Sequence, residues 1–261
     1  MIVSRRQPMH IAILETGRIN PAIADRFPRY PDMFRSMFDA ASLSATGGAP
    51  DTDSFTFTAV PVLDGEFPAT VDDYDGYLVT GSAAGVYDDY DWIDPLKAFI
   101  RDLHAADKPL AGVCFGHQII AEALGGTCIK WPGGWGVGPF DVALDNTPRW
   151  MPQRDQVRLI HVHQDQVTRL PEGATHLGAT GFCDNAMFYV GDSVFCMQGH
   201  PEFEADYTGA LLTLREDSIG TEKVATALEG LKQEHEGIVI ARWILSFFAG
   251  HAASRAAETA A

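Results

Sequence analysis

The first half of the chain alternates short apolar runs with segments in which hydrophobic residues recur at helical spacing. In the segment 32–41, for example, the hydrophobic residues lie as on one face of a helix. Parallel strands need crossover connections, and helices of this length provide them. The pattern therefore predicts an α/β fold, a doubly wound and mostly parallel sheet with helices on both faces. The expected strands of this half are residues 10–14, 54–62, 74–82 and 110–113.

The middle of the chain has a different pattern, because its short strand candidates are joined by loops alone. Strands joined in this way are typical of antiparallel pairing. Two more apolar runs in the segment 187–198 flank Gly191 and Asp192, which is a hairpin signal. We therefore expect a small antiparallel extension of the sheet. Its candidate strands are residues 127–130, 137–144, 156–162 and 174–179.

Helical periodicity returns over residues 222–248, with or without an interruption near Gly237. The last residues, 251–261, are expected to form a frayed tail. No repeat or linker divides the chain. We therefore expect a single domain over residues 1–250, followed by the tail 251–261.

The overall charge narrows the classes of partner. The chain carries 19 Lys and Arg against 35 Asp and Glu, a net charge of −16. Such a surface repels phosphate backbones and anionic lipids. Nucleic acid and membranes are therefore poor candidate partners, whereas a small molecule remains a good one; the charge leaves the oligomeric state open.

Cysteine usage bears on the compartment. The four cysteines, Cys114, Cys128, Cys183 and Cys196, show no C-x-x-C spacing of the kind found in disulfide frameworks or zinc sites. The apolar run near the start of the sequence is too short for a signal sequence or a membrane span. We expect thiols in a reducing compartment, with a cytoplasmic location as the default.

The segment "LAGVCFGHQ", residues 110–118, places one cysteine between an apolar strand and a helix, with glycines on both sides. A strained turn of this kind is typical of a nucleophile elbow. At a helix start the free N–H groups and the positive end of the dipole favour a thiolate. The pattern thus indicates a nucleophilic Cys114, and the alternative is a buried structural cysteine in a βα turn.

A cysteine nucleophile needs a base, and the base needs an acceptor that orients it. The segment "MQGHPEF", residues 197–203, supplies His200 and Glu202 two positions apart at the end of a predicted strand. Their side chains can therefore point the same way. They can act on Cys114 only if the two strands lie close together in the sheet.

Four separated motifs resemble those of the class I glutamine amidotransferases, and they follow one another along the chain in the order found in that family. "GVCFGHQ" resembles the family's nucleophile signature and "GHPE" its histidine and glutamate pair. "LVTGS", residues 78–82, resembles its oxyanion strand, and "HVHQDQV", residues 161–167, its H-x-D-x-V segment. The resemblance implies the family's flavodoxin-like fold. "QGHPEF", "CFGHQIIAEALGG" and the segment after His163 resemble the stand-alone branch, which includes plant γ-glutamyl peptidases and glutaminases like those of GMP synthases.

By this resemblance, Cys114 is the nucleophile, His200 the general base and acid, and Glu202 the residue that holds the imidazole. The backbone N–H of Phe115 and that of Gly81 or Ser82 are the implied oxyanion hole. Gln118 is implied to contact the α-amino acid end of the substrate, or else is a polar helix residue near the surface. His163 is interpreted as a substrate-pocket residue.

Other features carry weaker hypotheses. His161 and His163 could face one metal, but spacing places no third ligand, so we expect no metal and no other cofactor. Asp165 is expected to form structural hydrogen bonds. The acidic run 86–94 either binds a cation or a basic partner, or is a solvated loop that caps the next helix.

Three functions remain open at this point. The first is a free-standing hydrolase of γ-glutamyl amides, and the second a glutaminase subunit that delivers ammonia to a separate ATP-dependent synthetase. Many synthetase-linked members have an aromatic residue before the catalytic histidine, where this chain has Gly199. Gly199 is therefore interpreted as widening the pocket for a substituted amide, which favours the hydrolase. The third function is a catalytically silent member of the fold that binds a partner or a metabolite.

Overall fold

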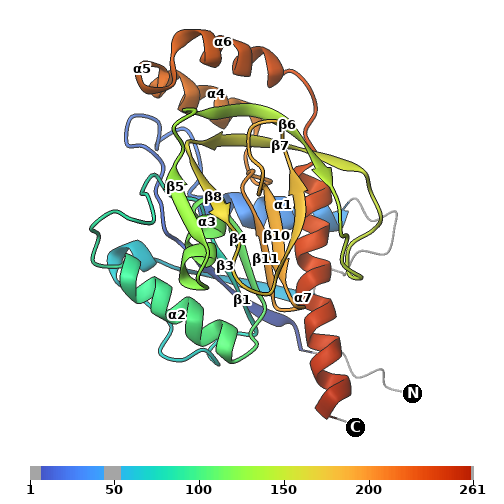
Figure 1. Cartoon of the computed structure of the whole chain (residues 1–261). Coiled ribbons are helices and arrows are strands. Elements are labelled where there is room, and N and C mark those ends of the chain that lie inside the picture. The colour runs from blue at the N-terminus through green and yellow to red at the C-terminus, as the bar shows by residue number, and fades with distance from the viewer. Residues whose placement is uncertain (1–6, 44–53, 260–261) are drawn as a thin grey trace.

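A computed structural model describes residues 7–43 and 54–259 of the chain (Figure 1). Its centre is a nine-stranded sheet in the order β2-β1-β3-β4-β11-β10-β9-β6-β7, and β5 and β8 form a separate two-stranded sheet. The strands are β1 (Met9–Leu14), β2 (Phe55–Val60), β3 (Gly76–Val79), β4 (Leu110–Val113), β5 (Thr127–Lys130), β6 (Gly136–Leu144), β7 (Gln156–His163), β8 (Asp165–Arg169), β9 (Ala174–Ala179), β10 (Met187–Val190) and β11 (Val194–Met197). The helices are α1 (Tyr30–Leu43), α2 (Ile93–Ala105), α3 (Phe115–Ala123), α4 (Ala205–Leu214), α5 (Glu216–Ile219), α6 (Thr221–Gly230) and α7 (Gly237–Thr259), with a 3-10 turn, η2, at Val62–Asp64.

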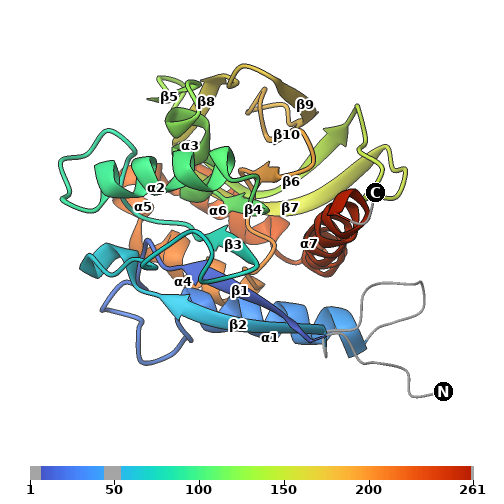
Figure 2. The same cartoon turned by 90° about the horizontal axis from the view of Figure 1, so that it is seen from below.

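Strands β2, β1, β3, β4 and β11 pair in parallel and confirm the predicted fold class. Alternate residues of β1 face opposite sides of the sheet. Ile11 and Ile13 join a core with α1 and α7, whereas Ala12 and Leu14 join a core with α2 and α3. Figure 2 shows α1 and α2 on the two sides of β1 and β3. Helices on both faces explain why β1, β3, β4 and β11 are nearly continuous apolar runs, whereas the edge strand β2 alternates.

The predicted antiparallel extension is also present. β10 pairs with both β11 and β9, and β6 pairs with β7 and β9, all antiparallel. The small second sheet pairs β5 with β8, a strand that the sequence pattern did not indicate because four of its five residues are polar or charged. The extension lets the chain leave the parallel sheet after α3 and return to it through β11, beside β4.

The C-terminal region is helical as expected, with the interruption near Gly237 that the pattern left open. Residues 231–236 separate α6 from α7, and α7 continues through the predicted tail as far as Thr259, so the frayed tail from residue 251 is wrong for the described residues. The remaining tail residues, 260–261, and the first residues, 1–6, lie outside the described part of the chain. A Cβ on Gly237 would lie 2.1 Å from the carbonyl oxygen of Pro201, so only glycine allows α7 to start this close to the segment after β11.

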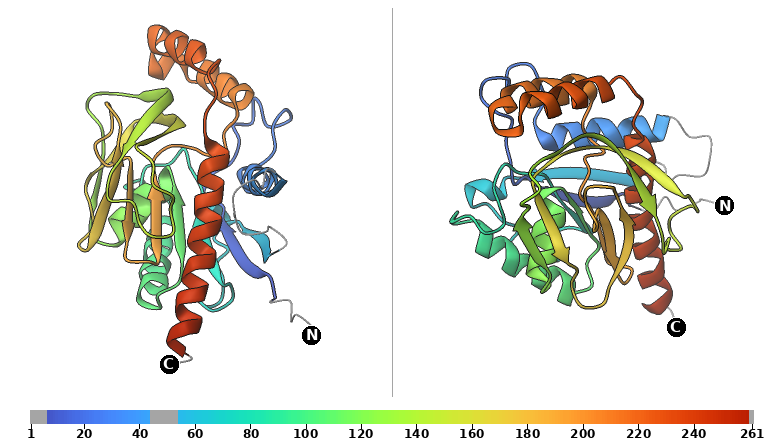
Figure 3. Two further views of the ribbon diagram at one scale, coloured as in Figure 1. Left: turned by 90° about the vertical axis from the view of Figure 1, so that its right-hand side faces the viewer. Right: turned by 45° about the horizontal axis from the view of Figure 1, so that its top comes forward.

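Helix α7 is the one helix of the described residues long and apolar enough to cross a membrane, by length and composition only. Half of that stretch is buried inside the protein, where Trp243, Phe247 and Phe248 contribute to the core on the α1 side of the sheet. Figure 3 shows α7 running along the molecule, with α4, α5 and α6 gathered at the end opposite to the C-terminus. Its apolar composition is therefore explained by packing within the fold.

Candidate active site

Cys114 lies on a strained turn between β4 and α3. Its backbone angles are φ 54° and ψ −103°, and only Asp107 and Asn146 share a positive φ among the non-glycine residues of the described part of the chain. Such a conformation is unfavourable and persists only where the surroundings hold it. The N–H of Cys114 donates to the carbonyl oxygen of Met197 at 2.9 Å, and its own carbonyl oxygen accepts from the N–H of Gln118 at 3.1 Å. The turn is therefore fixed by β11 on one side and α3 on the other.

The glycines of the motif bring α3 unusually close to the sheet. A Cβ on Gly116 would lie 2.2 Å from the carbonyl oxygen of Val79, and one on Gly112 would lie 2.7 Å from the carbonyl group of Gly116. No real Cβ atom tolerates such distances to backbone atoms. Glycine at both positions therefore lets the helix start directly above the ends of β3 and β4.

Replacing Gly116 by alanine is expected to destabilise the protein by about 2 kcal/mol or more, since overpacking against backbone cannot relax. For a chain of this size that lowers the melting temperature by about 4–8 °C, measurable by calorimetry. Gly209→Ala is the matched control, because Gly209 also lies in a helix and its Cβ would meet only the Leu228 side chain at 3.5 Å. We expect that variant to be as stable as the wild type or more so. Equal melting temperatures for the two variants would contradict the close-packing argument.

The structure brings His200 and Glu202 next to Cys114. β11 pairs in parallel with β4, with Met197 opposite Val113, so both chains leave the sheet at the same edge. His200 N–H donates to the carbonyl oxygen of Ile160 at 2.7 Å, and its Nδ1 lies 2.8 Å from Oε1 of Glu202. The same imidazole interacts with the Cys114 sulfur electrostatically and through a hydrogen bond.

All three groups are buried, with exposed fractions of 4–6%. Burial disfavours a charged imidazole, but the Glu202 carboxylate and the Cys114 sulfur outweigh it and raise the pKa of His200 to about 10. His200 is therefore protonated at neutral pH, and it carries a positive charge beside the sulfur. Within the described residues, Oε2 of Glu202 has no hydrogen-bond partner, so His200 is the group that compensates this carboxylate.

The backbone at Gly81 lies beside both His200 and Cys114. A Cβ on Gly81 would lie 2.9 Å from Cε1 of His200 and 3.7 Å from Cβ of Cys114, so a side chain does not fit there. Ser82 lines the same cavity as Cys114. Phe115 is the first residue of α3, and its N–H has no acceptor within the helix. The N–H groups implied for the oxyanion hole thus lie on segments that border the sulfur.

Two residues that the sequence analysis missed hold this backbone. The Thr16 hydroxyl donates to the carbonyl oxygen of Thr80 at 2.9 Å, and the Thr16 N–H donates to the Thr80 hydroxyl at 3.0 Å. A Cβ on Gly17 would lie 2.6 Å from the carbonyl oxygen of Gly81. The signal for both is the "TG" pair that follows the first strand after one residue, Glu15, at the sheet edge where Cys114 lies.

Cys114 opens into a cavity of about 250 Å³. Gln118, predicted to bind substrate, also lines it; its side chain is buried and its Nε2 donates to the Asp165 carbonyl oxygen at 3.0 Å and to Oε1 of Gln198 at 3.1 Å. Nε2 of Gln198 lies 3.6 Å from the Cys114 sulfur. Gln198 is a further missed residue, and it connects Gln118 to the sulfur. The reading of Gln118 as a surface residue is wrong.

A model of the family "Glutamine amidotransferase class-I" matches residues 55–214, more than half of the chain. The chain belongs to this family. The matched region of the amidotransferase chain contains the elbow, His200 and Glu202.

Relatives of this chain include γ-glutamyl peptidase 3 of Arabidopsis thaliana, 37% identical over 154 residues that cover 56% of this chain and 62% of the peptidase. The chain thus matches less than two thirds of that relative's length. A Schizosaccharomyces pombe protein described as glutamine amidotransferase-like is 30% identical over 82% of this chain and 88% of its own. The crystal structure of a glutamine amidotransferase from Methylobacillus flagellatus aligns with a TM-score of 0.70 at 21% identity, covers 93% of each chain, and supports the same fold.

In this amidotransferase chain His163 lines the pocket, and His161 lies behind it. Nδ1 of His163 lies 3.0 Å from the carbonyl oxygen of Asp165 and so donates to it, which leaves Nε2 to accept from Nδ1 of His161 at 3.3 Å. Burial lowers the pKa of both rings, that of His163 to about 4. Both are therefore neutral, and no group of three or more metal-binding side chains includes them among the described residues.

The interpretation of Gly199 as a widening of the pocket is wrong. A Cβ on Gly199 would lie 2.8 Å from Nε2 of His161 and 2.8 Å from Cβ of Leu159, so β7 fills the space beside it. Glycine at this position is explained by the contact between this segment and β7.

The acidic run 86–94 does not cap the next helix, as one of its two interpretations held. The residue before α2 is Trp92, and no side chain caps the helix, so the loop does not serve as a cap. Asp88 instead accepts from the N–H of Gly85 at 2.8 Å and, like Tyr87, lines the cavity at Cys114. The side chain of Asp165 meets that of Tyr87 there, while its carbonyl oxygen accepts the structural hydrogen bonds described above.

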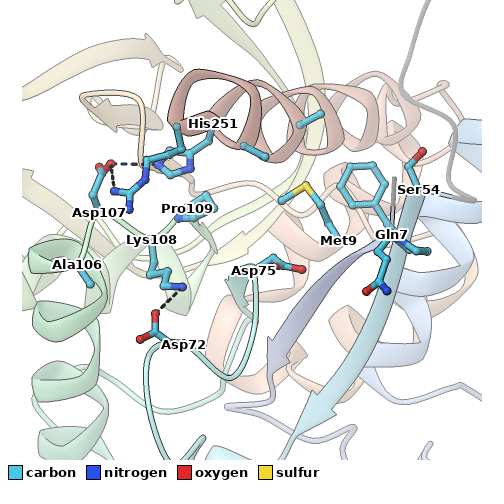
Figure 4. A pocket seen from close by; sticks show the side chains of 15 residues that line it. Gln7, Met9, Ser54, Asp72, Asp75, Ala106, Asp107, Lys108, Pro109 and His251 are labelled. Carbon is cyan, nitrogen blue, oxygen red and sulfur yellow. Dashed lines mark hydrogen bonds and ion pairs between the residues drawn. The ribbon is translucent and has the colours of Figure 1, made fainter. Parts of the chain in front are cut away.

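A larger cavity of about 620 Å³ lies at the opposite edge of the sheet, beside the starts of β1 and β2. Figure 4 shows Lys108 paired with Asp72 there. Asp107 pairs with Arg255, and Nε2 of His251 lies 3.4 Å from the same carboxylate. No cysteine lines it.

The thiols of Cys128, Cys183 and Cys196 are buried, and burial raises the pKa of each. Cys114 is thus the one cysteine of the described residues that lines the smaller cavity and also lies beside the His200 imidazole.

Proposed function

We propose that the protein hydrolyses γ-glutamyl amides through a γ-glutamyl thioester on Cys114. The observation that carries this proposal is the arrangement of Cys114, which lines the cavity, with His200 and Glu202 behind it and the imidazole protonated beside the sulfur. The family assignment and the relatives named γ-glutamyl peptidase support the same substrate class.

In the first half of the reaction, the Cys114 thiolate attacks the carbonyl carbon of the amide and forms a C–S bond. The negative charge that develops on the carbonyl oxygen is stabilised by the N–H of Phe115 and by that of Gly81 or Ser82; each such donor contributes about 3 kcal/mol. His200 then gives its proton to the amine nitrogen as the C–N bond breaks. The amine leaves and the γ-glutamyl thioester remains.

In the second half, neutral His200 removes a proton from water, and the oxygen attacks the thioester carbon. The C–S bond breaks, glutamate is released, and the thiolate and the imidazolium form again. Glu202 keeps the imidazole oriented through both halves and stabilises its charge. The net reaction is transfer of an acyl group to water, and it needs no cofactor.

Incubation of the chain with glutamine, glutathione and a panel of γ-glutamyl amides, with released glutamate as the readout, tests the proposal. We expect turnover by the chain alone. Turnover that requires an added ATP-dependent protein would favour the ammonia-delivering subunit instead. A folded protein that releases no glutamate from any substrate would favour the silent binding member.

The pH profile gives a separate test of the electrostatics. A raised pKa means that the stability gained from charged His200 is complete below its ordinary value of about 6.5 and is lost as pH rises through about 10. Activity should likewise fall only on the alkaline side of this range, as the proton for the amine is lost. In Glu202→Gln the alkaline limb should move to lower pH by about one pH unit or more, because an opposite charge has been removed. An unmoved limb would contradict the role given to Glu202.

A further inference from the structure

A second hollow lies beside the catalytic cavity and has no role in the reaction so far described. Its volume is about 820 Å³, against about 250 Å³ for the cavity at Cys114. Both are lined by Ser82, Ala83 and Ala84, so this short segment is the wall between them. A substrate group that extends from Cys114 past this segment would reach the larger hollow.

The hollow lies on the side of His200. Gly17, which lines it, packs against Gly81, since its Cβ would lie 2.6 Å from the Gly81 carbonyl oxygen. Gly81 in turn packs against His200, with a Cβ position 2.9 Å from Cε1 of the ring. An acid that protonates the leaving amine must lie within hydrogen-bond reach of its nitrogen. A substituent on that nitrogen is therefore expected near Gly81, the residue that precedes the shared segment 82–84.

The lining of the hollow is aromatic. Tyr90 is 54% exposed and stacks on Trp92, with ring centroids 6.0 Å apart and planes 21° apart. Trp92 also packs edge to face on Phe115, the residue after the nucleophile, at 5.5 Å. Phe67 lines the hollow as well, and an ion pair between Arg18 and Asp64 forms another part of its wall. The exposed Tyr90 ring, stacked on the buried Trp92 that packs on the Phe115 ring, is suited to bind an apolar or aromatic group.

We propose that this hollow is the leaving-group subsite, and that the preferred substrates are γ-glutamyl amides whose amine carries a bulky apolar or aromatic substituent. The glutamyl part occupies the cavity at Cys114, and the amine part lies against Tyr90 and Trp92. Ammonia, the amine released from glutamine, leaves the hollow unused. This inference rests on the proposed hydrolysis.

The test compares γ-glutamyl-phenylalanine with glutamine as substrates of the wild type and of Tyr90→Ala. The wild type should have the higher kcat/KM for γ-glutamyl-phenylalanine. In Tyr90→Ala that value should fall about tenfold, because a stacking contact is lost, while the value for glutamine changes by less than about twofold. Tyr90→Phe should keep the wild-type preference, since the ring is retained. Leu214→Ala is the matched control, because it removes another exposed hydrophobic side chain that lines neither cavity.

The outcomes separate the two proposals. Hydrolysis of glutamine with none of γ-glutamyl-phenylalanine, or equal losses for both substrates in Tyr90→Ala, would overturn the subsite and leave the hydrolase intact. A folded wild type that releases glutamate from neither substrate and is not alkylated at Cys114 by a γ-glutamyl chloromethyl ketone would overturn the hydrolase, and the subsite with it.

Discussion

Replacing Cys114 by alanine should lower the turnover of γ-glutamyl amides by about ten-thousand-fold or more, since no thioester can form. The fold should survive, because the turn is held by backbone hydrogen bonds to Met197 and Gln118 that alanine retains. Glutamate release measured over long incubations, with circular dichroism to confirm folding, would show both effects.

The matched control for this change is Cys128→Ala. Cys128 is equally small and buried, but it lies on β5 and lines neither of the cavities beside the elbow. Its loss should leave kcat within about twofold, as expected of a substitution away from the reacting groups. If Cys114→Ala keeps a substantial part of wild-type turnover, another nucleophile acts and the proposed chemistry is wrong.

The second large effect is expected from His200→Gln. Without a residue to protonate the amine and to activate water, kcat should fall about a thousand-fold or more. Stability should fall too, by about 3 kcal/mol or more, because the Glu202 carboxylate is left buried without the charge that compensates it. Chemical denaturation measured beside the kinetics separates these two losses.

The double variant His200→Gln with Glu202→Gln distinguishes the electrostatic loss from a packing defect. Removing the carboxylate together with the imidazole should restore most of the lost stability, while activity stays as low as in His200→Gln. A double variant less stable than His200→Gln alone would show that the two side chains are not an ion pair in the folded protein.

Much of the fold followed from the hydrophobic pattern, because a βα unit is encoded locally. The run of apolar residues before Cys114 and the glycines around it are sufficient to predict β4, the turn and α3. The pattern left open whether the helical stretch is interrupted near Gly237. The reason is that Gly237 is required by a contact with Pro201, a residue far away in the sequence.

The candidate site could be predicted only in part. Spacing alone could not show that β11 returns to pair with β4, which is what brings His200 to Cys114; the resemblance implied it. Thr16 and Gly17 contact Thr80 and Gly81, and only the short "TG" pair after the first strand marks them. Gln198 acts through a tertiary contact with Gln118 that no local pattern marks. The interpretation of Gly199 failed for the same reason, since the space beside it is filled by β7.

The central claim is that Cys114 is the nucleophile, activated by His200. Incubation with diazo-norleucine followed by peptide mass spectrometry tests it most directly. The account predicts one adduct per chain, on Cys114 alone, slowed by excess glutamine and strongly reduced in His200→Gln. A folded wild-type protein that stays unlabelled, or carries the adduct on Cys128, Cys183 or Cys196, would contradict it.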